Sequence, residues 1–113
     1  MSKSHSPNDP SKKGLDEQVY ECLLSIPKGK VVTYKDIALC LGNPHLARAV
    51  GNALHHNPDA RKYPCYKVVN GKGELAENFA FGGLEGQKKR LAEEGIPVEN
   101  GRVDLNRYRH HVP

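Results

Sequence analysis

The feature that most restricts the fold of this chain is a pair of short helical segments on either side of Gly42. The first begins at residues 33–36 (TYKD), where a hydroxyl residue stands three positions before a carboxylate, the pattern of a helix capping box. Gly42 ends this helix, and Asn43 and Pro44 begin the next one as N-cap and first-turn proline. Two short helices joined by a tight turn predict a helix-turn-helix.

The second helix of the pair has two different faces. Apolar residues recur at helical spacing and predict a buried stripe made of Leu46, Ala49, Val50, Ala53 and Leu54. The opposite face carries the polar residues His45, Arg48, Asn52, His55 and His56. Small residues on this helix would let a partner approach the backbone closely, namely Ala47, Ala49 and Gly51. Two interpretations stay open, a surface that contacts a partner and an ordinary solvated helix face.

The remaining segments predict two further helices and little strand. Residues 14–25 form the first helix, whose apolar face consists of Leu15, Val19, Cys22, Leu23 and Ile26. Residues 30–32 and 63–69 are expected to be extended, and residues 83–94 form a helix with Leu84, Lys88 and Leu91 on one side. Asn-Gly at 100–101 between alternating apolar residues predicts a hairpin. The fold class is therefore mainly α with a small β component, a winged-helix-like domain with a helix-turn-helix and a C-terminal β-hairpin.

Length and composition allow one domain and a polar tail. Residues 1–13 are rich in Ser, Pro and Lys and are predicted to be disordered, which leaves residues 14–113 as the domain. No apolar run approaches the roughly 20 residues that span a bilayer. The N-terminal residues also lack the apolar stretch of a signal peptide. We therefore expect a protein without a membrane partner that is not secreted and works in the cytoplasm of a prokaryote or the nucleus of a eukaryote.

Positive charge is concentrated in one segment. Residues 28–72 carry eight Lys or Arg against two Asp, a local charge of +6, whereas the whole chain carries +4. A charge run is often only a solvated surface. Here it coincides with the helix-turn-helix, which favours a polyanion such as DNA as the partner.

The three cysteines point to free thiols. Cys22, Cys40 and Cys65 form no CxxC pair, and an odd count argues against a disulfide framework. Cys22 and Cys40 lie within the predicted helices and are interpreted as structural. A zinc site that uses the cysteines with His55 and His56 has no ligand pair at finger-like spacing. No metal and no cofactor are expected.

Four motifs in unbroken order resemble one known family. They are VVTYKDIA at 31–38, ARAVGNALHHNP at 47–58, PCYKVV at 64–69 and EEG at 93–95. Together they resemble the DNA-binding domain of the O6-alkylguanine-DNA alkyltransferases over residues 15–96. The resemblance implies DNA repair by a monomer that binds double-stranded DNA containing O6-alkylguanine in the minor groove and flips the damaged base.

The resemblance also implies a role for each matching residue. Cys65 corresponds to the alkyl acceptor, Glu94 to the buried carboxylate of the catalytic relay, and Asn57 to the asparagine that braces the active-site turn. Arg48 fills the space left by the flipped base, and Tyr34 crowds the phosphate and favours rotation of the nucleotide. The further DNA contacts expected are Thr33, Ala47, Gly51, Asn52 and Lys67.

The physical chemistry of these roles can be stated without the family. The O6 substituent of guanine lies in the major groove, so a protein in the minor groove reaches it only after base flipping. A thiolate is the nucleophile, and an ordinary thiol is only a few per cent ionised at pH 7. Nearby positive charge from Lys67, or a partner base, would have to raise the ionised fraction of Cys65. Attack on a saturated carbon gives a thioether, so this cysteine methyltransferase would act once per molecule.

Three departures from the family keep a second function open. Tyr66 stands where the family has a histidine beside the nucleophile, and a phenol with a pKa near 10 is a poor base, so His55 or His56 would have to replace it. The family's N-terminal domain is missing. The short chain and its C-terminal hairpin also resemble the alkyltransferase-like proteins, which flag the lesion and recruit other repair proteins. Those proteins replace the cysteine, whereas Cys65 is retained here.

Two other interpretations also stay open. Cys65 could be a buried apolar thiol without a chemical role. The domain could also be a sequence-specific winged-helix regulator, which would need no thiol beside its reading helix.

Overall fold

The computed structural model describes residues 14–59, 61–76 and 81–110. In chain order the elements are α1 (Leu15–Leu24), β1 (Val32–Thr33), α2 (Tyr34–Cys40), a 3₁₀ helix (Pro44–Leu46), α3 (Ala47–His55), a second 3₁₀ helix (Cys65–Lys67), β2 (Val68–Val69), α4 (Gly83–Glu93) and α5 (Leu105–Tyr108). The mainly helical class is confirmed. The predicted disordered tail, residues 1–13, lies outside the described residues.

The helix-turn-helix is formed by α2 and α3, and its start is the predicted capping box. The Thr33 hydroxyl accepts a hydrogen bond from the Asp36 amide at 3.1 Å, and the Asp36 carboxylate accepts one from the Thr33 amide at 2.9 Å. The turn contains Gly42 at φ 91°, a left-handed conformation that favours glycine. Asn43 then caps the following 3₁₀ helix by accepting a hydrogen bond from the His45 amide at 2.9 Å. The local signals therefore place the start of α2 correctly, whereas the helix predicted from Asn43 and Pro44 begins as a 3₁₀ helix and α3 itself starts at Ala47.

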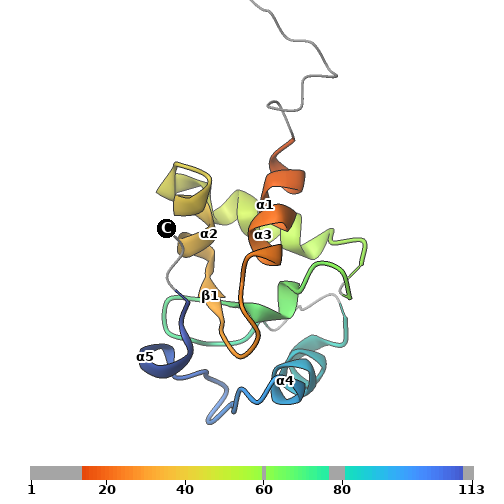
Figure 1. The fold of residues 1–113 in the computed structure, drawn as a ribbon, viewed down its shortest axis with the longest axis vertical. Coiled ribbons are helices and arrows are strands. Elements are labelled where there is room, and N and C mark those ends of the chain that lie inside the picture. Colours follow the sequence, from red (N-terminus) through yellow and green to blue (C-terminus); the bar gives the residue numbers. More distant parts are fainter. Residues whose placement is uncertain (1–13, 60, 77–80, 111–113) are drawn as a thin grey trace, which may run out of the picture.

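Helices α1 and α2 pack against the apolar stripe of α3. The buried residues of this stripe are Val50, Ala53 and Leu54, and they form a core cluster with residues of α1 and α2. Tyr20 of α1 donates a hydrogen bond from its hydroxyl to the Ala53 carbonyl at 2.9 Å. Figure 1 shows α1, α2 and α3 grouped at one end of the molecule, with α4 and α5 at the other.

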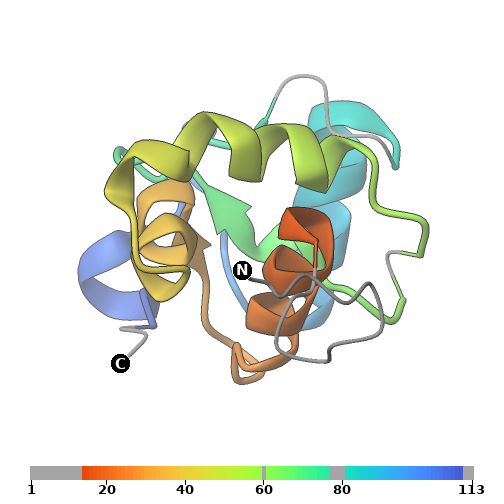
Figure 2. The ribbon, with the colours of Figure 1, turned by 90° about the horizontal axis from the view of Figure 1, so that it is seen from above.

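A short parallel ladder joins the two ends. Val32 pairs with Val68 and Thr33 pairs with Val69. Alternate residues of β1 face opposite sides, so Val32 belongs to the helical cluster while Val31 packs in a second cluster with Leu91, Ile96 and Val103. Seen from above in Figure 2, α3 lies across the molecule on one side of these strands. The ladder thus fixes the position of β2, and with it the segment that carries Cys65, relative to α2.

The C-terminal hairpin is smaller than predicted. Asn100 and Gly101 both have positive φ, and Glu99 and Arg102 exchange backbone hydrogen bonds of 2.9 and 3.0 Å, so the predicted turn is present. The pairing stops there because the next amide, that of Val103, donates to the Gly73 carbonyl at 2.8 Å instead. The predicted hairpin is therefore present as a turn closed by one antiparallel residue pair, because a tertiary contact with another loop takes the place of longer strands.

The chain then forms α5, which the sequence analysis did not predict, and returns to the centre of the fold. The Val31 amide donates to the Tyr108 carbonyl at 2.8 Å, and the His110 amide donates to the Val31 carbonyl at 2.7 Å. Arg109 donates from Nε to the Asp36 carboxylate at 2.9 Å, which ties this segment to the cap of α2. In the described part of the chain, no helix is long and apolar enough to cross a membrane.

Candidate functional site

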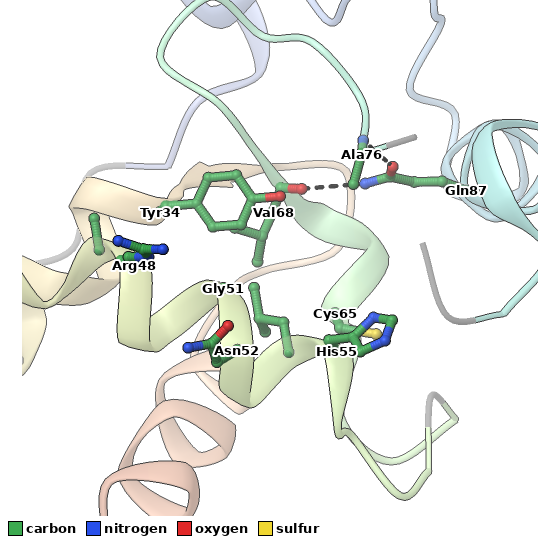
Figure 3. Close-up of a pocket in the computed structure, with 11 residues that line it drawn as sticks. Tyr34, Arg48, Gly51, Asn52, His55, Cys65, Val68, Ala76 and Gln87 are labelled. Atoms are coloured by element: carbon green, nitrogen blue, oxygen red, sulfur yellow. Dashed lines mark hydrogen bonds between the residues drawn. The ribbon is translucent and has the colours of Figure 1, made fainter. Parts of the chain in front are cut away.

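A cavity of about 390 Å³ lies beside α3 and contains Cys65. It is lined by Tyr34, Ala47, Arg48, Gly51, Asn52, Leu54, His55, Cys65, Val68, Ala76 and Gln87. Figure 3 shows that these side chains come from α2, from α3, from the Cys65–Val68 segment and from α4. The structure therefore brings together residues that the sequence analysis named from separate motifs.

Asn57 supports the chain that leads to Cys65. Its side chain is buried, and Nδ2 donates to the Tyr63 carbonyl at 2.8 Å while Oδ1 accepts from the Asp59 amide at 3.0 Å. The Cys65 amide donates to the same Tyr63 carbonyl at 2.7 Å. Asn57 and the backbone of Cys65 thus share one acceptor, which holds the turn after α3 against the start of the Cys65 segment.

The thiol of Cys65 lies in an environment that disfavours its ionised form. The residue is only 4% exposed, and burial raises the pKa of the Cys65 thiol. A hydrogen bond from Asn57 and the positive charge of Arg90 act in the opposite direction but do not compensate. At neutral pH the residue is therefore held mainly as the neutral thiol.

Tyr66, the residue after the cysteine, contacts Glu94 rather than the thiol side of the cavity. Its hydroxyl donates a hydrogen bond to Oε2 of Glu94. Burial and this contact with the carboxylate raise the pKa of Tyr66, so the phenol stays protonated. Burial also acts to raise the pKa of Glu94, but hydrogen bonds from Tyr66, the Gly29 amide and Lys67 lower it overall. Glu94 is therefore an ionised carboxylate with three donors.

Lys67 is the third partner of this carboxylate, and it does not line the cavity that contains Cys65. The residue is 2% exposed, and Nζ lies 2.9 Å from Oε1 of Glu94 and donates to the Pro27 carbonyl at 2.7 Å. The ammonium group that the resemblance assigns to a DNA contact is therefore buried in this structure. Because Glu94 neutralises its charge, it also does not provide the unpaired positive charge expected beside Cys65.

Thr33, which was expected to contact DNA, is also buried. Thr33 is 4% exposed, and its hydroxyl is used to cap α2. Its neighbour Tyr34 does line the cavity, and burial raises the pKa of the Tyr34 hydroxyl. The first turn of α2 therefore presents one of the two predicted side chains to the cavity and buries the other.

The predicted residues of α3 do lie together at the cavity. Arg48 and Asn52 are exposed on its rim, and Gly51 has open space where a Cβ would stand. Of the two histidines considered as substitutes for the family's imidazole, His55 lines the cavity with Cys65 (Figure 3). The ring of His56 instead lies at the end of α3, with Nδ1 2.7 Å from the Asn52 carbonyl.

Gln87 is a site residue that the sequence analysis missed. It is 1% exposed, and Nε2 donates to the carbonyls of Tyr66 at 3.0 Å and Val68 at 3.1 Å, while Oε1 accepts from the Ala76 amide at 2.8 Å. This side chain fixes three backbone groups at the far wall of the cavity. A signal was present, because Gln87 stands at helical spacing between Leu84 and Leu91, a polar residue within the apolar stripe.

The basic segment at 28–72 does not form one surface. Lys28, Arg61 and Lys62 line a different cavity of about 360 Å³, to which the buried Lys67 also belongs together with Tyr66 and Glu94. Arg48 lies at the cavity that contains Cys65. The local charge of +6 is therefore not all presented beside Cys65, since the fold places these side chains in separate regions.

Fold and site together define a class of domain. It is a helix-turn-helix whose second helix forms one wall of a cavity that contains a thiol. The chain belongs to the family described as 6-O-methylguanine DNA methyltransferase, DNA binding domain, whose model matches residues 14–96. The resemblance noted from the motifs is thereby confirmed.

Individual relatives differ in length and in their named functions. The chain is 43% identical over 95 residues to a bifunctional methyltransferase/endonuclease of Picrophilus torridus, of which it spans only 31%. It is 40% identical over 93 residues to a DNA base-flipping protein of Vibrio parahaemolyticus, a match that covers 81% of this chain and 91% of that protein. The crystal structure of S. pombe Atl1 in complex with damaged DNA containing O6-carboxymethylguanine is similar with a TM-score of 0.76 and 34% identity, covering 87% of this chain and 94% of Atl1.

Proposed function

We propose that this protein acts in DNA repair by binding double-stranded DNA in the minor groove, turning O6-alkylguanine into the cavity beside α3 and accepting the alkyl group on Cys65. The observation that carries the proposal is the position of the thiol. Cys65 lines the same cavity as Arg48 and Tyr34, and that cavity falls in the range of roughly 300–1,000 Å³ typical of small-molecule sites. A thiol with only a packing role would not have to lie at a cavity that also contains Arg48 and Tyr34.

Binding of damaged DNA is supported by the helix-turn-helix and by the relatives. Arg48 and Asn52 are exposed on α3, and Gly51 offers open space for close approach of a partner. The similar S. pombe protein is seen with DNA containing O6-carboxymethylguanine, and the similar Vibrio protein is named for base flipping. In this chain Arg48 is the long cationic side chain at the cavity rim that would enter the duplex and offset the lost stacking.

The transfer step balances as a displacement at carbon. A bond forms between Sγ of Cys65 and the alkyl carbon while the bond from that carbon to O6 of guanine breaks. The thiol loses one proton, and the departing guanine gains one at its ring nitrogen. Tyr34, which lines the cavity and whose pKa is raised, keeps its hydroxyl proton and can donate a hydrogen bond to the flipped base.

Removal of the thiol proton is the demanding step in this chain. Tyr66 donates its hydroxyl to Glu94 and does not act as a base. His55 is the titratable imidazole that lines the cavity, and Arg90 acts to lower the pKa of Cys65 by its charge. We infer that His55 accepts the proton, directly or through water. We also infer that alkyl transfer is slower in this chain than in family members that have the histidine relay.

A second function is favoured by the same observation. Because burial raises the pKa of Cys65, the protein could flip and hold the lesion without reacting with it, as a sensor that recruits other repair proteins. The extent of the match to the Vibrio base-flipping protein supports this alternative.

Intact-mass analysis separates the two functions. After mixing with an oligonucleotide that contains O6-methylguanine, we expect one added methyl group per protein, located on Cys65 and absent from Cys22 and Cys40. The Cys65→Ala variant should bind the same oligonucleotide without gaining mass. If protein saturated with the lesion stays unmodified after long incubation, the sensor function replaces the transferase.

A further inference from the structure

The other two cysteines lie against each other at the packing of α1 on α2. Sγ of Cys22 and Sγ of Cys40 are 2.8 Å apart, although 18 positions separate the residues. Cys22 is 9% exposed and belongs to the core cluster, whereas Cys40 is exposed in the last turn of α2. Neither residue lines the cavity that contains Cys65. The pair is therefore separate from the Cys65 cavity and lies where α1 packs on the first helix of the helix-turn-helix.

The geometry requires little movement for a covalent bond. A disulfide has an S–S length of about 2.05 Å, so the two sulfurs need to approach by less than about 1 Å. Ile37 and Ala38 of α2 are buried in the same cluster as Cys22, which keeps the two helices in register. An exposed thiol in contact with a buried one is the arrangement in which an oxidant reaches one sulfur and the neighbour resolves the product.

We propose that Cys22 and Cys40 are an oxidisable pair that forms a reversible disulfide between α1 and α2 when a low-molecular-weight disulfide, such as oxidised glutathione, reaches the exposed Cys40. This inference is independent of the function proposed for Cys65. It assigns a modification site to the contact between α1 and α2, whose two thiols were interpreted from the sequence as structural.

The reaction balances in two exchange steps. Cys40, as thiolate, attacks one sulfur of oxidised glutathione, which forms a mixed disulfide and releases one glutathione thiol. Sγ of Cys22 then loses its proton and attacks Sγ of Cys40, which forms the protein disulfide and releases the second glutathione. Two electrons and two protons leave the protein and appear in two molecules of reduced glutathione.

The order of attack follows from the environments of the two sulfurs. Burial and the hydrogen bond to Cys40 raise the pKa of Cys22 to about 12, so this thiol is a poor first nucleophile. Cys40 is exposed to solvent and to the oxidant. Once the mixed disulfide has formed, Cys22 needs no encounter in solution because its target sulfur is already in contact.

The test is thiol counting and peptide mapping on the full chain after treatment with oxidised glutathione. We expect the count in denaturant to fall from the three cysteines of the sequence to one. Proteolysis without reductant should yield a linked peptide that contains Cys22 and Cys40, and dithiothreitol should restore all three thiols. The oxidised protein should melt at a higher temperature than the reduced one, since the cross-link restricts the unfolded chain.

Variants make the outcome decisive. Cys65→Ser should still form the linked peptide, whereas Cys40→Ala should form no intramolecular disulfide and keep its other thiols. Cys22→Ala should instead accumulate glutathione on Cys40. Stable glutathionylation of Cys40 in the parent protein, with Cys22 still free, would overturn the proposal. So would a disulfide that joins Cys40 to Cys65.

Discussion

The hydroxyl of Tyr66 donates a hydrogen bond to Oε2 of Glu94, while Oε1 of the same carboxylate lies 2.9 Å from Nζ of Lys67. The carboxylate that matches the end of the family's relay is thus fully engaged, but the group between it and Cys65 is a phenol that keeps its proton. Glu94 orients Tyr66 and compensates the charge of a buried lysine. It has no path by which to draw a proton from the thiol.

Replacement of Tyr66 by histidine should therefore speed alkyl transfer near neutral pH. An imidazole can bond Glu94 and accept the thiol proton, and general-base catalysis of this kind is worth about a hundredfold or more. The rate of the parent protein should keep rising with pH beyond the ordinary pKa of a thiol, because the raised pKa of Cys65 shifts its ionisation to higher pH. Single-turnover rates with an O6-methylguanine oligonucleotide, measured from pH 6 to pH 10, would give both profiles.

The matched control is Tyr66→Phe, which removes the hydroxyl without adding a base. Its rate should not exceed that of the parent at any pH. A thermal melt of each variant separates catalysis from packing, since histidine is smaller than tyrosine. If Tyr66→His folds as the parent does and shows the same pH profile, the missing imidazole is not what limits the reaction.

Exchange of the histidines on α3 tests which of them serves the thiol. His55 lines the cavity with Cys65, whereas His56 does not. We expect His55→Ala to slow transfer near neutral pH by about tenfold or more and to lose part of this defect as hydroxide takes over at high pH. His56→Ala, a change of the same size one residue away, should leave the rate within about twofold of the parent. Equal effects would remove His55 from the mechanism.

Arg48 should matter more for lesion binding than any lysine of the same charged segment. Its side chain lies at the rim of the Cys65 cavity, while Lys28 lies at a different cavity. Arg48→Ala should weaken binding of an O6-methylguanine duplex by about tenfold or more, corresponding to roughly 1.4 kcal/mol. Lys28→Ala serves as the control, and titrations at several salt concentrations would show whether it changes the salt dependence at all. A common loss of affinity in both variants contradicts the insertion of Arg48 into the duplex.

The buried Asp36 should stabilise the fold through its charge. Burial raises its pKa, but hydrogen bonds from Arg109 and Thr33 lower it overall, so the folded-state pKa lies below the unfolded value. This stabilisation is fully present above the unfolded pKa and is lost as pH falls through the folded pKa.

Asp36→Asn should lower the free energy of unfolding at pH 7 by about 1–3 kcal/mol. Urea melts from pH 7 to pH 2 should also show a smaller acid-dependent loss in this variant. Arg109→Lys should keep the cap and show a milder loss. If Asp36→Asn loses as much unfolding free energy at low pH as the parent does, other carboxylates cause the acid-dependent loss.

The parts of the fold that could be predicted were those whose signals are local. The capping box at Thr33, the turn at Gly42 and the apolar stripe of α3 each depend on residues within one or two helical turns, and all three are present. The predicted residues of the cavity followed from motif resemblance. By contrast, the burial of Lys67 depends on its ion pair with Glu94. That residue is 27 positions away, and no local sequence pattern indicates the pairing.

Two other differences have the same cause. Gln87 is polar and was placed on no site, although its side chain binds backbone groups of three distant residues. The hairpin at Asn100 and Gly101 satisfied the local rule for a turn, but the strand pairing beyond it lost to the contact between Gly73 and Val103. That contact is so close that a Cβ at residue 73 would stand 2.2 Å from the Val103 carbonyl oxygen.

The return of residues 108–110 to Val31 and of Arg109 to Asp36 has a consequence for how the protein is made. The first helix of the DNA-binding unit acquires its last stabilising contacts from residues that lie 73 positions further along the chain. While the ribosome is still adding these residues, α2 and β1 can form, but one edge of the strand and one charge of the cap stay unpaired. A nascent chain that has not yet reached these residues, or a chain cleaved before them, would therefore expose the edge of β1 to pairing with other chains.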